Sequence, residues 1–247
     1  MKLTARTGMM LRELTRRGWL RHVGGLAVAA LIVWAFLELR AQWSPMHKWN
    51  RAFGDASMLL VAMTMAIGPL ARLWPGFALL LPWRREFGIW AIVAGGVHTV
   101  IILDGWVEWD LARLVGYVFH PLLNQYVMVE KGFGLGNLIG IAALLYGLVL
   151  AATSNDLSQR VLGMTVWKFI QQGAYVLWAL VVVHTGYFLY IHFQDFHRPV
   201  PEPNVLRMPF AVMVGAVLML QIAASIKTWR RRRLHRGGVR YDAMGQT

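Results

Sequence analysis

The stretch of sequence that decides the fold is VWKFIQQGAYVLWALVVVHTG, from Val166 to Gly186. It is long and apolar enough for a helix to cross a hydrocarbon core of about 30 Å, and it carries His184 near its end. An imidazole in hydrocarbon is costly unless its nitrogen atoms are satisfied. The stretch therefore predicts a membrane helix whose histidine has a function.

The rest of the chain has the composition of an integral membrane protein. Of its 247 residues 57% are hydrophobic and only 15% are charged, which excludes a soluble globular domain. We predict an all-α bundle of six transmembrane helices, with a basic segment at 1–22, a transmembrane domain at 23–227 and a basic tail at 228–247. The six predicted spans are Val23–Leu39, Phe53–Leu70, Phe87–Leu103, Phe133–Ala152, Val166–Ile191 and Leu206–Ile226.

The distribution of charge predicts the orientation of this bundle. The chain has 25 Lys and Arg against 12 Asp and Glu, and the basic residues concentrate before the first span, after the last span and in the loops on the same side. The positive-inside rule then places both termini in the cytoplasm. The basic tract that follows the last span suits anionic lipid headgroups, so we expect lipid contact and no nucleic-acid partner.

Two further features limit the chemistry. The chain contains no cysteine, which excludes disulfides, thiolate metal sites, iron–sulfur clusters and covalent haem attachment. The outside loop 104–131 has apolar runs too short to span, and we predict one or two short helices at the membrane interface there. No internal repeat and no soluble domain are evident.

His98 and His184 are the two histidines deep within predicted spans. His98 lies 13 residues after Arg85 and His184 lies 16 residues after Lys168, which is about 20 and 24 Å along a helix. Both imidazoles are thus expected in the outer half of the membrane, where a facing pair could supply both axial ligands of a b-type haem. Small residues that would let a porphyrin approach closely lie beside them: Gly95, Gly96 and Gly186.

Several blocks around these histidines resemble the ferric-reductase-like transmembrane family. Within it, they are similar to the MsrQ-like group, the haem-binding membrane subunits of the bacterial periplasmic methionine-sulfoxide reductase system. The blocks cover about residues 50 to 192. They are Gly68-Pro69-Leu70-Ala71-Arg72, Arg84-Arg85-x2-Gly88-x-Trp90-x7-His98, and Thr153-Ser154 with Leu162-Gly163 and Trp167-x3-Gln171-x3-Tyr175-x8-His184.

The resemblance implies a multi-pass protein of the bacterial inner membrane that carries electrons rather than catalysing a reaction alone. It implies one haem b between His98 and His184, a protein partner in or across the membrane, and possible use of quinol as the donor. Members of the family have a histidine where this chain has Gln171, and relatives with two haems have another near Arg84 and Arg85. A second, inner haem is therefore not expected, and the two arginines are candidates for haem propionate or lipid contacts.

Two alternatives stay open at this stage. In the first, the chain is a structural or accessory subunit that uses a ferric-reductase-like scaffold and has lost one or all haems. In the second, it is an outside-facing ferric or metal reductase that uses loop histidines. The weak candidates for such a metal site are His120, His192 and His197.

Overall fold

The computed structural model describes residues 2–129, 131–192 and 205–244. Within these ranges six helical segments are long and apolar enough to cross a membrane, as predicted. The helices that form them are α1 (Lys2–Glu38), α2 (Pro45–Leu73), α3 (Trp83–Gly105), α5 (Lys131–Thr153), α6 (Asp156–Gln172) with α7 (Ala174–Tyr187), and α9 (Arg207–Met244). Shorter elements are the 3₁₀ helix η1 (Pro75–Leu80), α4 (Leu111–Leu114), the strands β1 (Tyr117–His120) and β2 (Gln125–Met128), and the π-helical turn η2 (Phe188–His192).

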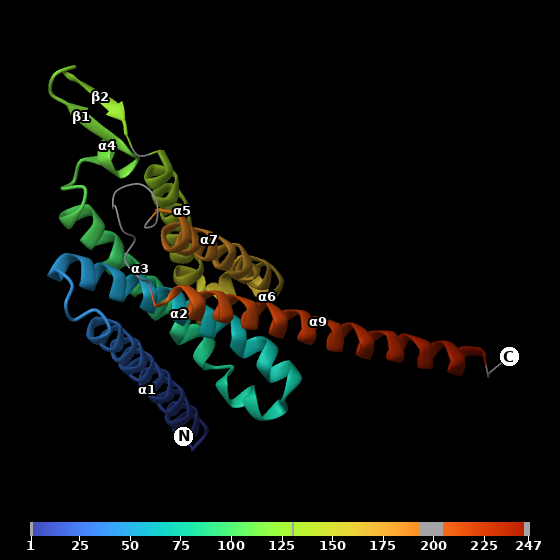
Figure 1. The fold of residues 1–247 in the computed structure, drawn as a ribbon. Helices are drawn as coiled ribbons and strands as arrows, with labels where there is room; N and C mark the ends of the chain where they lie inside the picture. Colours follow the sequence, from blue (N-terminus) through green and yellow to red (C-terminus); the bar gives the residue numbers. More distant parts are fainter. Residues whose placement is uncertain (1, 130, 193–204, 245–247) are drawn as a thin grey trace.

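Helix α2 lies at the centre of the bundle and contacts α1, α3, α7 and α9 (Figure 1). Its apolar side chains, among them the fully buried Leu60, form the main core with Phe87 of α3 and Trp178 of α7. A second cluster joins α3, α5 and α7 around Ile92 and Leu177. These two clusters hold α3 and α7 beside each other, which sets up the site described below.

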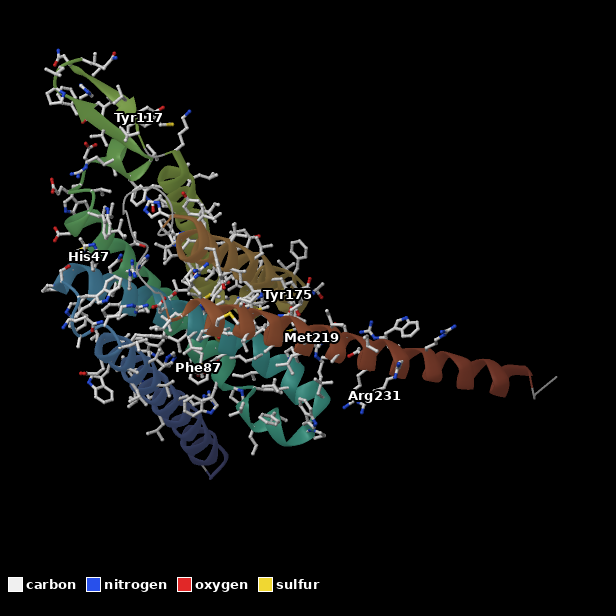
Figure 2. All side chains as sticks on the ribbon, in the orientation of Figure 1. His47, Phe87, Tyr117, Tyr175, Met219 and Arg231 are labelled. Carbon is white, nitrogen blue, oxygen red and sulfur yellow. The ribbon has the colours of Figure 1, made fainter. Side chains whose placement is uncertain are left out.

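Two helices run further than the spans predicted from the sequence. Helix α1 includes residues 2–22 of the basic segment, and α9 includes much of the tail that follows position 227, so each helix continues across a predicted domain boundary. The 38 residues of α9 correspond to about 57 Å, nearly twice the hydrocarbon thickness. Figure 1 shows its last part extending beyond the bundle, and Figure 2 places Arg231 there.

The loop 104–131 differs from the prediction. One short helix is present, α4, which begins at Asp110 where the carboxylate accepts a hydrogen bond from the backbone N–H of Ala112 at 2.9 Å. Residues 117–128, however, form an antiparallel hairpin in which Tyr117 faces Met128 and His120 faces Gln125. Aromatic and β-branched residues favour strands, and Pro121 and the positive φ of Asn124 suit a tight turn rather than a helix.

The hairpin extends away from the helices at the end of the molecule opposite the tip of α9 (Figure 1). Tyr117, labelled in Figure 2, lies within it. Its apolar side chains are largely exposed, with Leu122 at the turn 91% accessible. The hairpin is thus a surface element rather than part of the core.

Candidate functional site

His98 and His184 lie on neighbouring helices and face each other. The centres of their rings are 6.4 Å apart and the ring planes are nearly perpendicular, at 85°. Two imidazoles that ligate one metal ion from opposite sides, each with a nitrogen at about 2.0 Å from the metal, have ring centres roughly 6.3 Å apart. The structure therefore brings the two predicted ligands to the separation that a shared iron requires.

Each imidazole is oriented by a backbone carbonyl group. Nδ1 of His98 donates to the carbonyl oxygen of Asn50 at 2.9 Å, and Nδ1 of His184 donates to that of Gly136 at 2.8 Å. A carbonyl oxygen only accepts hydrogen bonds, so each ring carries its proton on Nδ1 and leaves Nε2 with a free lone pair. Histidine ligands of metals are typically held in this way.

Two glycines that were not predicted to lie against the histidines give the rings their space. A Cβ atom at Gly140 would lie 2.6 Å from Cε1 of His184, and one at Gly54 would lie 3.0 Å from Nδ1 of His98. Both positions line the same cavity as the histidines. Of the three glycines predicted to pack against a porphyrin, Gly95 lines this cavity, whereas Gly96 and Gly186 are not among its lining residues.

The cavity between the helices has a volume of about 190 Å³ and is lined by residues of α2, α3, α5 and α7. Most of its wall is apolar, for example Ile92, Leu144 and Leu177. Within the described part of the chain, the charged residues that line it are Arg40, Arg51 and Asp55. The cavity thus offers two metal-binding nitrogen atoms, apolar walls and one charged end, which together fit a flat apolar molecule with a metal centre and acidic substituents.

The two histidines are held by contacts that have the same spacing along the sequence. Each histidine is 48 residues after the carbonyl that holds it, and each holding residue is followed four positions later by the glycine that makes room. The counterparts differ by 86 positions, as 50 and 136, 54 and 140, and 98 and 184 do. No internal repeat was predicted from the sequence, and the similarity around the histidines is little more than Val97-His98-Thr99 and Val183-His184-Thr185. The shared spacing is a correspondence between the contacts of the two histidines.

At the end of the bundle away from the hairpin, two polar side chains join pairs of helices. Nε2 of Gln171 donates to Oγ1 of Thr153 at 3.0 Å and to the carbonyl oxygen of Leu150 at 3.3 Å. Nε of Arg84 makes the corresponding bond to the carbonyl oxygen of Thr64 at 3.1 Å. Gln171 thus joins α6 to α5, and Arg84 joins α3 to α2.

Neither arginine predicted as a propionate contact lines the cavity. Arg84 bonds to Thr64, and Arg85 pairs with the exposed Asp156 at 3.1 Å. Both lie 13 or 14 residues before His98, about 20 Å along α3. The lipid-contact role predicted for them stays a prediction.

The loop histidines are not gathered into a metal site where the structure describes them. His192 lines the cavity and packs against the ring of Phe133 at 5.4 Å, and His120 lies on β1. His197 is outside the described residues. Among the residues that are described, no three His, Cys, Asp or Glu side chains converge on a common point.

The fold and this site define a class of protein: a six-helix membrane protein with a facing pair of histidines in a largely apolar cavity. No family model matches the chain. It is, however, 27% identical over 214 residues to the protein-methionine-sulfoxide reductase heme-binding subunit MsrQ of Bordetella parapertussis, covering 87% of this chain and 90% of that protein. The MsrQ of Ralstonia nicotianae is 28% identical over 141 residues, or 57% of this chain and 58% of that protein.

A shorter match is to the magnetosome protein MamZ of Magnetospirillum gryphiswaldense, 25% identical over 57% of this chain but only 20% of that protein. The long match to MsrQ covers the whole region of the predicted blocks. The chain is therefore similar to MsrQ proteins over most of its length, and the resemblance predicted from its sequence is confirmed.

Proposed function

We propose that this protein is an electron-transfer subunit of the bacterial inner membrane that binds one b-type haem between α3 and α7. The observation that carries the proposal is the facing pair of His98 and His184, with ring centres 6.4 Å apart and each Nδ1 held by a backbone carbonyl. The relatives are themselves named heme-binding subunits. Bound haem would supply a one-electron iron couple at this position.

The residues of the chain have separate tasks in this proposal. The carbonyl groups of Asn50 and Gly136 fix the tautomer of each histidine, so that Nε2 faces the cavity with its lone pair. Gly54 and Gly140 let the rings lie close to α2 and α5, which fixes their positions. The apolar wall excludes water, and burial of this kind tunes the reduction potential of an iron centre.

One haem, rather than two, agrees with the contacts at the inner end. The amide of Gln171 is engaged with Thr153 and Leu150, and Arg84 is engaged with Thr64. An amide is a poor iron ligand and a guanidinium has no free lone pair for a metal. The proposed haem therefore lies in the half of the bundle that carries the hairpin, and it exchanges electrons on that side.

Quinol is the proposed donor and a periplasmic protein the proposed acceptor. The relatives are named as subunits of a reductase, which supports a protein partner for this chain too. The exposed apolar hairpin lies on the cavity side of the molecule, where such a partner would approach. The competing proposal is a structural subunit without haem. The glutamine at position 171, where a histidine is expected, favours it, but the intact pair of His98 and His184 does not.

The test is a reduced-minus-oxidised spectrum of the purified protein together with a pyridine haemochrome assay. We expect one b-type haem per chain, lost in His98→Ala and in His184→Ala. His47→Ala is the matched control, because His47 bonds to Ser44 at 2.6 Å and does not line the cavity. Gln171→Ala should also retain the haem.

Two results would contradict the proposal. Protein that contains no haem after expression with excess haem precursor, yet is folded and part of a stoichiometric membrane complex, would support the structural subunit instead. Two haems per chain would show that the inner end of the bundle also binds iron.

A further inference from the structure

We propose that the side chains of Arg40 and Asn50 bind the oxygen atoms of a quinol at the charged end of the histidine cavity. This inference rests on the proposed electron-transfer function, which it deepens by assigning residues to the electron donor. Both residues line the cavity, and neither was a candidate from the sequence.

Two buried polar atoms without partners are the first support for this subsite. Arg40 is 6% accessible and Asn50 is 7% accessible. Nη2 of Arg40 pairs with Asp55, but Nη1 is buried without a hydrogen-bond partner, and so is Oδ1 of Asn50. An unpaired buried donor or acceptor costs free energy. The cavity therefore lacks one acceptor, at Arg40, and one donor, at Asn50.

The missing donor at Asn50 separates this subsite from the proposed haem site. The edge of a haem carries methyl, vinyl and carboxylate groups, and its four nitrogen atoms ligate the iron. A bound haem thus has carboxylates that can accept a hydrogen bond from Arg40, but it has no group that donates one to Asn50. The acceptor on Asn50 requires a second ligand that carries an O–H group.

A quinol has the groups that these two side chains lack. Its aromatic ring carries two hydroxyl groups, and each hydroxyl both accepts and donates. One oxygen accepts from Nη1 of Arg40, and a hydroxyl donates to Oδ1 of Asn50. Trp106 and Phe133 also line the cavity, and aromatic side chains of this kind pack well against a ring.

The backbone of Asn50 places this subsite next to the proposed iron ligand. Its carbonyl oxygen accepts the hydrogen bond from Nδ1 of His98, so a quinol bound at its side chain lies close to that histidine. The oxidised quinone has carbonyl oxygens in place of hydroxyls and cannot donate to Asn50. The subsite therefore favours the reduced form of the donor and releases the oxidised form.

A comparison of two ligands on the full-length protein tests this inference. Protein whose haem has been reduced with dithionite is titrated in detergent under argon with a short-chain benzoquinol and with the dimethyl ether of the same quinol. Ferrous haem takes no electron from either ligand, so calorimetry measures binding alone. The ether accepts hydrogen bonds but donates none, and we expect the quinol to bind about tenfold more tightly.

Substitutions of Asn50 show whether its side chain causes this preference. Asn50→Leu removes the acceptor but keeps the backbone carbonyl that holds His98, so haem should remain and the preference should be lost. Asn50→Asp keeps an acceptor oxygen and should keep the preference. Gln171→Leu is the matched control, because the amide of Gln171 bonds to Thr153 and Leu150 and does not line the cavity.

Arg40 is tested together with its partner. A change of Arg40 alone leaves the carboxylate of Asp55 without this cation, so both are replaced by apolar residues in Arg40→Met/Asp55→Leu. Quinol and ether both accept from Nη1, so both should bind about tenfold more weakly, with the ratio between them unchanged. This variant keeps the inference testable if Asn50→Leu does not fold.

The outcomes separate this inference from the function on which it rests. Purified protein without haem would overturn the haem function, and the reduced spectrum detects this before any titration. If haem is present but neither ligand binds, or both bind equally, the haem function stands and the quinol subsite is overturned. An unchanged preference in Asn50→Leu, or unchanged binding of both ligands in Arg40→Met/Asp55→Leu, likewise overturns it, since these polar atoms would then bind water only.

Discussion

The imidazole of His184 lies against α5 at Gly140, where even one methyl group would collide with it. The nearest ring atom is 2.6 Å from the Cβ that an alanine would add, and the Nδ1 atom that bonds to Gly136 is 2.7 Å from it. The ring cannot move away without losing that hydrogen bond. The position of the proposed ligand therefore depends on a residue that never touches the iron.

We expect Gly140→Ala to lower haem content strongly and to destabilise the protein by about 1–3 kcal/mol, as overpacking of a close contact does. Haem per chain and the midpoint of thermal unfolding in detergent measure the two effects. Gly96→Ala is the control, because a Cβ there meets nothing within 4 Å, and alanine favours a helix over glycine. Equal haem content in the two variants would show that Gly140 does not position His184.

At the same scale, the two proposed ligands were predicted from the sequence, but the residues that contact their rings were not. His98 and His184 were recognisable because each is a polar residue in a long apolar segment. Gly54 and Gly140 were not, since their role depends on which ring lies opposite, and this follows only from the packing of α2 on α3 and α5 on α7. Arg40 and Asp55 were missed for the same reason: their charges pair only when the chain after α1 folds back on α2.

Among the helices, α1 packs on α2 and α3 through apolar side chains, and among its described side chains Arg21 also forms an ion pair with α3. Nε of Arg21 lies 3.2 Å from Oε1 of Glu86 in the first turn of α3. The side chain of Glu86 is 2% accessible and that of Arg21 is 37% accessible. An unpaired Glu86 carboxylate would therefore cost more free energy than an unpaired Arg21 guanidinium, because water reaches only the arginine. Trp90 adds a hydrogen bond to the carbonyl of His22 at 3.1 Å.

Arg21→Ala should therefore destabilise the protein more than Glu86→Gln. The first substitution leaves a carboxylate buried without its cation, at a cost of about 3 kcal/mol or more, whereas the second leaves an arginine that reaches solvent beside a neutral amide. Thermal unfolding in detergent measures both. An equal loss in the two variants, or a larger loss in Glu86→Gln, would show that burial of the carboxylate does not set the cost.

The bounds of the helices and strands were also only partly predictable from the sequence. The second span was predicted as Phe53–Leu70, but helix α2 begins at Pro45. Its first turns carry Arg51 and other polar residues, which a search for apolar segments does not include. Arg51 is stabilised there by its contact with the ring of Trp43. The loop 104–131 was predicted to hold one or two short helices, and it holds α4 and a hairpin at 117–128. Short apolar runs have no clear period, so the sequence did not distinguish helix from strand there. Six spans, by contrast, follow from length and hydropathy alone, and all six are present.

For the whole molecule, the orientation of the bundle in the membrane decides which side the histidine cavity faces. The histidine cavity is in the half that carries the hairpin, while the basic part of α9, from Arg230 to Arg233, extends from the other half. Basic segments are retained in the cytoplasm, so we expect both termini inside and the cavity towards the periplasm. Alkaline phosphatase inserted after Leu122, at the exposed hairpin turn, should be active, and green fluorescent protein fused after Thr247 should fluoresce. The reverse pattern would turn the cavity towards the cytoplasm, and a periplasmic acceptor would then face only the end at Gln171, so electron transfer to such a partner would have to be abandoned.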